Sequence, residues 1–448
     1  MLDGALFLKL SRATKLFFYL VVSCLVFSVL AKVGRSQEYT ATQRAEVQQM
    51  LKGVADDVRK HYYDPQLRGL DWDAKVREAR EKIDKTNSMN RALTQVAALL
   101  DSLNDSHAFF LPPPRPYVHD YGFTMLMIGD HCYVSRVRPG SDAESKGLKP
   151  GDEIITLNGY TPTRQDFHRM EYIFWFLRPQ PGLQLHLRAP DGAERMIDIM
   201  AKIREISQVN NLSISAMYDN IRKMENDEHL LRIRYADRGD DLLIVKFPEF
   251  LPSLAEAGLI VGKMRKYNSV VIDLRGNPGG SVDTLLSFLG GVFENKVKIG
   301  DRVGRGSTKS IETEPHHHPF TGKLVVLVNS QSASASELFA RVIQLEKRGT
   351  VIGDRTSGSV MEAKLYTHST DTLTYTLYGA SITEADIKMS DGQSLENHGV
   401  VPDNAALPTA SDLAGGRDPV LAKAAELLNV KLSPEEAGAL LPYEWSKD

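Results

Sequence analysis

The strongest constraint on the fold is a buried strand that runs directly into a polar turn and then into a helix. The apolar run at residues 324–328 is typical of a strand covered on both faces. After the turn, apolar residues recur at helical spacing, namely Leu338, Phe339, Val342, Ile343 and Leu345. Small hydroxyl residues at such a helix start lie beside unpaired amides, where the helix dipole favours negative charge. The segment therefore predicts a strand-turn-helix unit that can present a nucleophile.

Ser334, at the start of this helix, has a structural interpretation as well as a catalytic one. Glu337 follows it by three residues, which is the spacing of a capping box. From these residues alone, capping is the more ordinary role.

Length and composition indicate a globular protein of several domains. At 448 residues the chain exceeds one ordinary core and predicts two or three domains. A net charge of −3 gives no indication of nucleic-acid binding. The 2 cysteines are Cys24 and Cys132, so we expect no internal disulfide in the mature protein. The alternating strand pattern around Cys132 favours a packed thiol over a catalytic one.

Residues 1–35 predict an export signal. Lys9, Arg12 and Lys15 precede an unbroken apolar run at 16–31, which is short for a membrane span and suitable for a signal peptide. A retained N-terminal anchor is the alternative. We therefore expect an exported protein, periplasmic or extracellular, that contacts a membrane only through this segment if it is not cleaved.

Residues 36–116 form a predicted helical N-terminal region. Apolar residues at helical spacing indicate helices around 42–58, 72–83 and 93–103. Ser106 and His107 follow the last of these, and prolines at 112–114 mark a boundary. Taken alone, His107 is an ordinary loop histidine.

Residues 117–203 form a separate unit of short strands. Their order, with the glycine-containing turn at 140–144 and the segment 147–159, is similar to a PDZ domain. In such domains, the amides of an apolar-Gly-apolar loop bind the C-terminal carboxylate of a peptide that adds as a strand. Tyr121, Gly122 and Phe123 match that loop and are the expected peptide-binding residues. A PDZ-like spacer that binds nothing is the alternative.

Residues 204–448 contain the predicted α/β core, after a polar, helix-rich connector at 204–240. A buried strand at 270–274 leads into a glycine-rich turn at 275–280, where backbone amides can approach a ligand closely. The turn lacks a Gly-Lys-Ser/Thr ending and a GxGxxG pattern, so nucleotide binding is not expected.

The segment 301–320 is interpreted as an irregular loop that contains three adjacent histidines, His316, His317 and His318. Adjacent histidines cannot all face one tetrahedral ion from a rigid element, and no Cys or acidic ligand pattern accompanies them. The sequence therefore implies no metal, and nothing in it implies an organic cofactor.

Three motifs in this order resemble the carboxyl-terminal processing peptidases, which belong to a wider group of serine peptidases that includes the tricorn core protease. They are DLRGNPGG at 273–280, SASASE at 332–337 and GDRT at 353–356, behind the PDZ-like unit. The resemblance implies a ClpP/crotonase-like catalytic core with an inserted PDZ-like domain. It also implies Ser334 as the nucleophile and an oxyanion hole formed at Gly279, Gly280 and Ala335.

One departure from this family pattern removes the usual base. In the carboxyl-terminal processing branch a lysine follows Gly-x-x-Thr-x-Gly, whereas here Ser359 follows it and Lys364 lies five residues further on. A serine without a base is a weak nucleophile. The tricorn-like branch implies instead a histidine beside a serine, and Ser106 and His107 match that pair in position.

The same branch implies a glutamate late in the core, for which Glu396 is the candidate and Glu384 the reserve. Histidine suits a base because its pKa lies near working pH. A carboxylate behind it would fix its tautomer, and Ser106 would support the site by hydrogen bonding.

The sequence thus predicts an exported serine endopeptidase that acts on protein or peptide substrates, selected by their C-termini through the PDZ-like domain. One alternative is a catalytically inactive peptidase fold that binds peptides or apolar ligands. Another is a Ser-Lys site with Lys364 as a displaced base. No oligomeric state is predicted.

Overall fold

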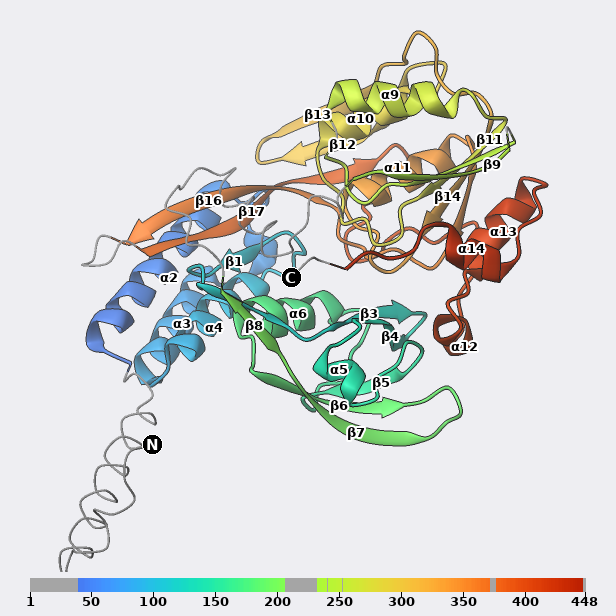
Figure 1. The fold of residues 1–448 in the computed structure, drawn as a ribbon. Helices are drawn as coiled ribbons and strands as arrows, with labels where there is room; N and C mark the ends of the chain where they lie inside the picture. The colour runs from blue at the N-terminus through green and yellow to red at the C-terminus, as the bar shows by residue number, and fades with distance from the viewer. Residues whose placement is uncertain (1–38, 206–231, 240, 252, 371–375, 446–448) are drawn as a thin grey trace, which may run out of the picture.

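The computed structural model describes residues 39–205, 232–239, 241–251, 253–370 and 376–445. Within these ranges it shows an α/β core, a PDZ-like unit and a helical N-terminal region, which confirms the predicted fold class (Figure 1). The predicted signal peptide or anchor at 1–35 lies outside them. No helix in these ranges is both long enough and apolar enough to cross a bilayer.

The core is built on a six-stranded sheet with the order β18-β15-β14-β11-β10-β9, parallel except for β9 at one edge. Its strands are β9 (Arg234–Arg238), β10 (Leu242–Lys246), β11 (Ser269–Asp273), β14 (Lys323–Val328), β15 (Thr350–Gly353) and β18 (Asn404–Ala405). Strands β10, β11 and β14 read as continuous apolar runs because helices cover both faces of the sheet.

Two helix layers cover this sheet (Figure 1). Helices α9 (Leu254–Met264), α10 (Val282–Gly290) and α11 (Ala335–Leu345) pack on one face, and α13 (Pro419–Leu427) and α14 (Pro434–Leu440) pack on the other. Strands β11 and β14 pair in parallel, so their carboxyl ends meet at the same edge. The glycine-rich turn at 274–280 and the serine-rich turn at 329–334 therefore lie side by side.

A long hairpin joins this core to the N-terminal helices. Its strands are β16 (Met361–Thr370) and β17 (Thr376–Met389). Ile387 and Met389 of β17 pack in the core, whereas Tyr378 and Ile382 pack against the helical region. That region consists of α2 (Ala41–His61), the 3₁₀ turn η2 (Leu67–Gly69), α3 (Trp72–Lys85) and α4 (Met89–Asp101). Strand β1 (Phe109–Leu111) also pairs with β17, which brings the loop before it to the core.

The interpretation of 301–320 as an irregular loop is wrong for its first part. Strands β12 (Val297–Gly304) and β13 (Ser307–Thr313) form an antiparallel hairpin that joins the sheet of β17. Strand β13 lies at the sheet edge and is mostly exposed, so it shows no apolar alternation. In the predicted helix-rich connector, residues 234–238 form β9, and 206–231 lie outside the described ranges.

The PDZ-like unit is a five-stranded antiparallel sheet with the order β3-β4-β5-β6-β7. Its elements are β3 (Phe123–Ile128), β4 (His131–Val137), α5 (Asp142–Ser145), β5 (Glu153–Leu157), α6 (Phe167–Glu171), the π-helical turn η3 (Tyr172–Leu177), β6 (Gly182–Arg188) and β7 (Glu194–Met200). Strands β2 (Tyr117–Asp120) and β8 (Lys202–Glu205) pair where the chain enters and leaves the unit. Cys132 is buried in this unit, as the alternating pattern predicted, and burial raises the pKa of its thiol.

Polar contacts dock the PDZ-like unit on the core. The Arg164 guanidinium donates to the Gly129 carbonyl at 2.9 Å and to the Arg355 carbonyl at 2.7 Å, and it pairs with Asp354. The Gly129 amide donates to the same Asp354 carboxylate at 2.9 Å. These contacts attach the β3-β4 turn to the segment that follows β15.

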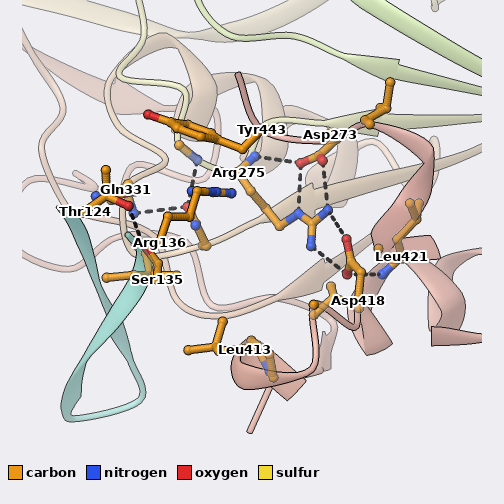
Figure 2. Close-up of a pocket in the computed structure, with 18 of the residues that line it drawn as sticks. Thr124, Ser135, Arg136, Asp273, Arg275, Gln331, Leu413, Asp418, Leu421 and Tyr443 are labelled. Carbon is orange, nitrogen blue, oxygen red and sulfur yellow. Dashed lines mark hydrogen bonds and ion pairs between the residues drawn. The ribbon is translucent and has the colours of Figure 1, made fainter. Parts of the chain in front are cut away.

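A cavity of about 770 Å³ lies between the PDZ-like unit and the core (Figure 2). On one wall, Arg275 forms a bidentate pair with Asp418 at 2.8 and 2.7 Å and also binds Asp273. On another wall, the Arg136 guanidinium stacks over the Tyr443 ring at 4.1 Å from its centroid. The short helix α12 (Ala410–Ala414) packs nearby against β4.

Replacing Phe288 by Ala tests the packing beneath the nucleophile helix. Phe288 is fully buried, with ring centroids 5.0 Å from Phe247 and 5.5 Å from Phe339. We expect the core to lose about 3–5 kcal/mol of unfolding free energy, because a large cavity replaces the ring. Urea unfolding followed by circular dichroism measures this loss. Leu259→Ala, at a side chain that is 74% exposed, should change the unfolding free energy by less than about 0.5 kcal/mol, and equal midpoints for the two variants would contradict the packing described.

Candidate active site

Ser334 has a strained backbone at the start of α11. Its φ of 54° and ψ of −118° lie in a region that residues other than glycine rarely adopt. Such strain costs about 1–3 kcal/mol and persists only where surrounding contacts enforce it. The side chain is half-buried rather than enclosed. The turn therefore presents Ser334 in a conformation that its own preferences would not produce.

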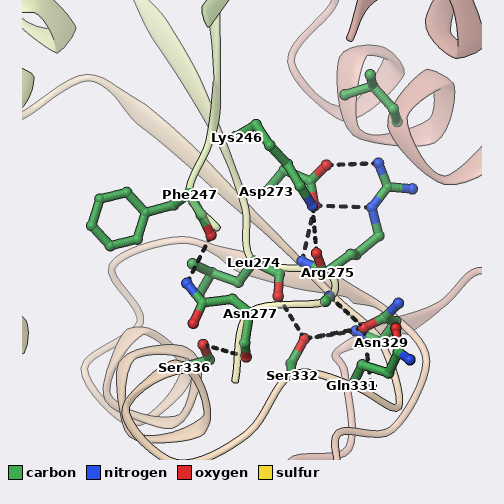
Figure 3. A network of polar contacts seen from close by, with 12 residues as sticks. Lys246, Phe247, Asp273, Leu274, Arg275, Asn277, Asn329, Gln331, Ser332 and Ser336 are labelled. Atoms are coloured by element: carbon green, nitrogen blue, oxygen red, sulfur yellow. Dashed lines mark hydrogen bonds and ion pairs between the residues drawn. The ribbon is translucent and has the colours of Figure 1, made fainter. Parts of the chain in front are cut away.

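The other serines of the motif hold the two turns together (Figure 3). Ser332 and Ser336 are fully buried, and their hydroxyls donate to the carbonyls of Leu274 at 2.8 Å and Asn277 at 3.0 Å. The Asn277 side chain in turn donates to the Phe247 carbonyl at 2.7 Å. Because the flanking hydroxyls are used in this way, the middle serine is the one left to react.

Ser106, His107 and Glu396 form a relay. The Ser106 hydroxyl lies 2.8 Å from His107 Nδ1 and donates to Glu396 Oε2 at 2.8 Å. The Ser106 amide donates to the other carboxylate oxygen, also at 2.8 Å. Glu396 is 6% exposed, and its burial raises its pKa. The carboxylate thus reaches the imidazole through Ser106 and not directly.

This relay selects the histidine tautomer. The Ser106 hydroxyl has a single proton, and that proton points to Glu396. His107 Nδ1 must then carry the proton that it shares with Ser106 Oγ, which leaves Nε2 with a free lone pair. Burial lowers the pKa of His107 below its ordinary value of 6.5, although nearby Asp105 raises it. The effect of burial is the larger of the two, so the net shift favours a neutral imidazole at neutral pH.

Residues 359–360 connect the relay to the nucleophile. The Ser334 amide donates to the Ser359 carbonyl at 2.8 Å. The next amide, that of Val360, donates to Glu396 Oε2 at 3.0 Å. Two consecutive residues therefore bond to the strained serine on one side and to the relay carboxylate on the other.

Two backbone amides beside Ser334 can stabilise negative charge. Among the described residues, the Gly280 and Ala335 amides have no acceptor in the protein. The expectation that Gly279 supplies a third donor is corrected, because its amide is bonded to Asn277 Oδ1 at 2.8 Å. Gly279 is needed for another reason. Its φ is 106°, and a Cβ there would lie 2.6 Å from the Ser334 Cβ.

Glu337 does more than cap the helix. Its carboxylate accepts the Ser334 amide at 3.1 Å, as a capping box predicts. It also accepts bonds from Thr356 Oγ1 at 2.5 Å and from the amides of Gly358 and Ser359 at 2.8 and 2.9 Å. Burial raises the pKa of Glu337 to about 7, while these donors act in the opposite direction. The carboxylate joins the nucleophile turn to the turn that carries Ser359.

The residues proposed as substitutes lie elsewhere. Lys364 is exposed on β16, with its ammonium 5.7 Å from the centroid of the Tyr366 ring. Glu384, on β17, accepts a hydrogen bond from the Tyr366 hydroxyl. Ser359, in the position of the usual lysine, bonds to the Ser357 hydroxyl at 2.8 Å. Of the two glutamate candidates, Glu396 is therefore the one bonded to Ser106.

The loop predicted to bind peptide carboxylates is partly occupied. The Gly122 amide donates to Asp120 Oδ1 at 2.9 Å, and Tyr121 and Phe123 are buried in the PDZ-like unit. The adjacent strand β3 lies at the sheet edge, where a peptide strand could add. The carbonyls of Met125 and Met127 on β3 accept bonds from Gln331 Nε2 at 3.2 Å and Ser330 Oγ at 2.7 Å.

Sequence reasoning missed three residues that organise the site. Asn277 lies inside the DLRGNPGG motif, which by itself indicates no role for this side chain. The spacing of Glu337 from Ser334 predicts only a helix cap. Asp105 immediately precedes the Ser-His pair, and its position in the sequence predicts no partner for it. In each case the local signal was present, but the partners come from distant segments.

Replacing Glu337 by Gln tests its role in positioning Ser334. The amide group would place a donor against the Ser334, Gly358 or Ser359 amide, so the two turns should separate slightly. We expect the rate of Ser334 labelling by a fluorophosphonate probe to fall by about 100-fold, the scale of a 1 Å misplacement. Glu346→Gln, at the exposed end of the same helix, is the control. Labelling at the same rate in both variants would contradict a positioning role.

Three segments of the chain match models of known protein families. Residues 241–406 match the model of peptidase family S41, residues 114–178 that of the PDZ domain, and residues 43–90 that of the Tricorn protease C1 domain. The crystal structure of mature CPAF shares the fold, with a TM-score of 0.62 at 16% identity over 84% of this chain and 95% of that one.

Two relatives show the extent of the similarity. The tail-specific protease of Haemophilus influenzae is 25% identical over 246 residues, which cover 53% of this chain and 33% of that protein. The chloroplastic carboxyl-terminal-processing peptidase 3 of Arabidopsis thaliana is 26% identical over 345 residues, which cover 73% and 62%. The chain thus spans a third to under two thirds of these relatives. Its matches to the S41, PDZ and Tricorn C1 models, in the order C1, PDZ and S41 along the chain, confirm the resemblance to carboxyl-terminal processing and tricorn-like serine peptidases.

Proposed function

We propose that the protein is an exported serine endopeptidase that uses a Ser-His-Ser-Glu site. The observation that carries this proposal is the strained Ser334 beside two amides that have no acceptor in the described part of the chain. Residues 359–360 join this serine to the Ser106-His107-Glu396 relay. Export is inferred from the basic residues and the apolar run at 16–31. Protein substrates are inferred from the family S41 and PDZ domains.

The reaction follows from the tautomer of His107. Nε2 takes the proton of Ser334 Oγ as that oxygen bonds to the peptide carbonyl carbon. The carbonyl oxygen becomes an oxyanion, which the amides of Gly280 and Ala335 stabilise. The imidazolium then gives its proton to the leaving amine, and the peptide C–N bond breaks. Water, deprotonated by the same nitrogen, attacks the acyl-enzyme and restores Ser334.

Glu396 supports the histidine through Ser106. As the imidazolium forms, Nδ1–H keeps its bond to Ser106 Oγ while the Ser106 hydroxyl stays bonded to the carboxylate. The negative charge of Glu396 therefore stabilises the His107 imidazolium across the intervening Ser106 hydroxyl. Because the two supporting groups act in series, removing either one removes most of the effect.

The PDZ domain would deliver the C-termini of substrates. Its edge strand β3 faces the turn that precedes Ser334, with Ser330 and Gln331 already bonded there. A peptide that adds to this edge would compete with those two side chains for the β3 carbonyls. Its binding would therefore change the hydrogen bonds of the turn before Ser334.

Labelling with a fluorophosphonate probe tests the proposed site. We expect wild-type protein to react at one serine and Ser334→Ala and His107→Ala to lose labelling by about 10³-fold or more, the scale of nucleophile and base loss. His398→Ala is a matched control, since His398 lies in the Glu396 loop with Nδ1 2.8 Å from the Glu396 carbonyl. Lys364→Ala should label normally.

The outcomes separate the alternatives. Loss of labelling in Lys364→Ala but not in His107→Ala would support a Ser-Lys site and contradict this proposal. A folded wild-type protein that never labels would favour a peptide-binding protein that has lost catalysis, an interpretation that Ser359 in place of the usual lysine supports.

A double-mutant cycle tests the series arrangement. Ser106→Ala and Glu396→Gln should each slow labelling, and the double variant should be about as slow as the slower single variant, because coupled residues are not additive. Multiplicative losses would mean that Glu396 acts on His107 by another route. Mass spectrometry of the labelled peptide measures each rate.

The pH dependence of labelling reports the base. His107 must be neutral to accept a proton, so the rate rises with pH through its pKa. Since burial lowers that pKa, we expect half-maximal labelling below pH 6.5 and a plateau at pH 7. Rates measured from pH 5 to 9, with folding checked by circular dichroism at each pH, give the curve. A midpoint above pH 7 would contradict a histidine with a lowered pKa as the base.

A further inference from the structure

Asp105 is a buried carboxylate next to the catalytic loop that the mechanism above does not use. Its side chain is 0% exposed. Asp105 Oδ1 accepts the His107 amide at 3.0 Å and the Thr383 hydroxyl at 2.7 Å. Its other oxygen, Oδ2, accepts the Tyr62 hydroxyl at 2.8 Å and lies 3.7 Å from the Arg68 guanidinium. Every partner donates to it, so the side chain acts only as an acceptor.

We propose that Asp105 is a positioning residue for the peptidase reaction, holding the His107 backbone in place and stabilising the imidazolium through its charge. This inference rests on the proposed role of His107 as the base. Asp105 itself touches neither Ser334 nor the imidazole by any hydrogen bond of the described residues.

The partners of Asp105 come from three separate elements. Tyr62 is the C-cap residue directly after α2, Arg68 belongs to η2, and Thr383 lies on β17. Arg68 also donates to the carbonyls of Leu103 and Asn104, at the start of the same loop. The tricorn-type helical segment and the core hairpin therefore converge on this carboxylate, and through it on His107.

The loop needs this support because its backbone is not held by regular structure. Asn104 has a positive φ of 49°, and strand pairing with β17 starts only at Phe109. The His107 amide would otherwise be free to move, and a small displacement of the imidazole is costly for proton transfer.

Ionisable side chains surround the loop that holds His107. On its own loop there is Asp105, across Ser106 there is Glu396, and behind Asp105 lie Arg68 and Tyr62. Asp105 raises the pKa of His107 against the effect of burial. An uncharged side chain of the same shape would therefore lower that pKa further.

A second buried carboxylate in the same region provides a matched control. Asp57, on α2, bonds to His368 Nε2 on β16 at 2.6 Å and is 9% exposed. It ties the helices to the hairpin as Asp105 does, but it does not contact the loop 104–108. A role in folding alone would make the two residues equivalent.

The test compares fluorophosphonate labelling rates of the full chain from pH 5 to 9 in wild type, Asp105→Asn and Asp57→Asn, with urea midpoints measured in parallel. We expect Asp105→Asn to lower the plateau rate by at least about tenfold, part of what general base catalysis supplies. The acid limb of its pH profile, where the labelling rate rises with pH, should move to lower pH. Asp57→Asn should keep the limb in place and the plateau within about threefold.

A limb that does not move in Asp105→Asn, or equal plateau losses in the two variants, would overturn the inference. Should Asp105→Asn not fold, Thr383→Val takes its place. Removing one neutral donor should lower the plateau by about threefold to tenfold, and an unchanged plateau would overturn the inference equally. The variant His107→Ala distinguishes failure of the proposed function from failure of the role proposed for Asp105. If it still labels, the proposed function fails. If it loses labelling while Asp105→Asn behaves as wild type, only this inference fails.

Discussion

The carboxylate of Glu337 is the interaction on which the rest of the site depends. It is fully buried, yet four donors surround it, and these belong to two turns that the chain reaches separately. Hydrogen bonds to an ionised acceptor are about twice as strong as neutral ones. They therefore offset part of the cost of burying the charge, although burial still raises the pKa of Glu337 to about 7, and they hold the strained backbone of Ser334. This carboxylate therefore fixes Ser334 and the segment 358–360 relative to each other.

From Glu337 the constraint spreads to the base. The segment that Glu337 holds also supplies the Val360 amide to Glu396, and Glu396 binds Ser106, which lies 290 residues away in sequence. The proposed base therefore follows the helical N-terminal region, while the proposed nucleophile follows a strand of the core sheet. Strand β17 makes this meeting possible, because one half of it packs in the core and the other half against the N-terminal helices. The helical region thus packs on the hairpin of the core and leads into the loop that holds the proposed base.

The position of the PDZ-like unit adds a second layer of coupling. Ser330 and Gln331 bond to the outer edge of β3, and Ser334 follows only three residues after Gln331. The same turn is anchored below by Ser332, whose hydroxyl bonds to Leu274. One short segment therefore contacts the PDZ-like unit on one side and the oxyanion amides on the other. A ligand at the β3 edge and a substrate at Ser334 would act on the same few residues.

The sequence alone determined the elements and the identity of the chemical groups. Apolar runs at 270–274 and 324–328 predict buried parallel strands, and spacing predicts the helices that cover them. Motif resemblance selected Ser334 among three serines and paired it with His107 when the usual lysine was absent. These signals are local or depend on short motifs, so they can be recognised without knowing how the elements pack.

Only the tertiary structure decided which groups are already bonded. It showed that the Gly279 amide is taken by Asn277, that Glu396 and not Glu384 reaches Ser106, and that Glu396 does so without touching the imidazole. It also showed that Asp105 bonds to the His107 amide, and that the first part of the expected loop at 301–320 belongs to the β12-β13 hairpin. The physical reason is common to all of these. A donor and an acceptor far apart in sequence meet only after packing has placed their strands, and no local periodicity encodes that meeting.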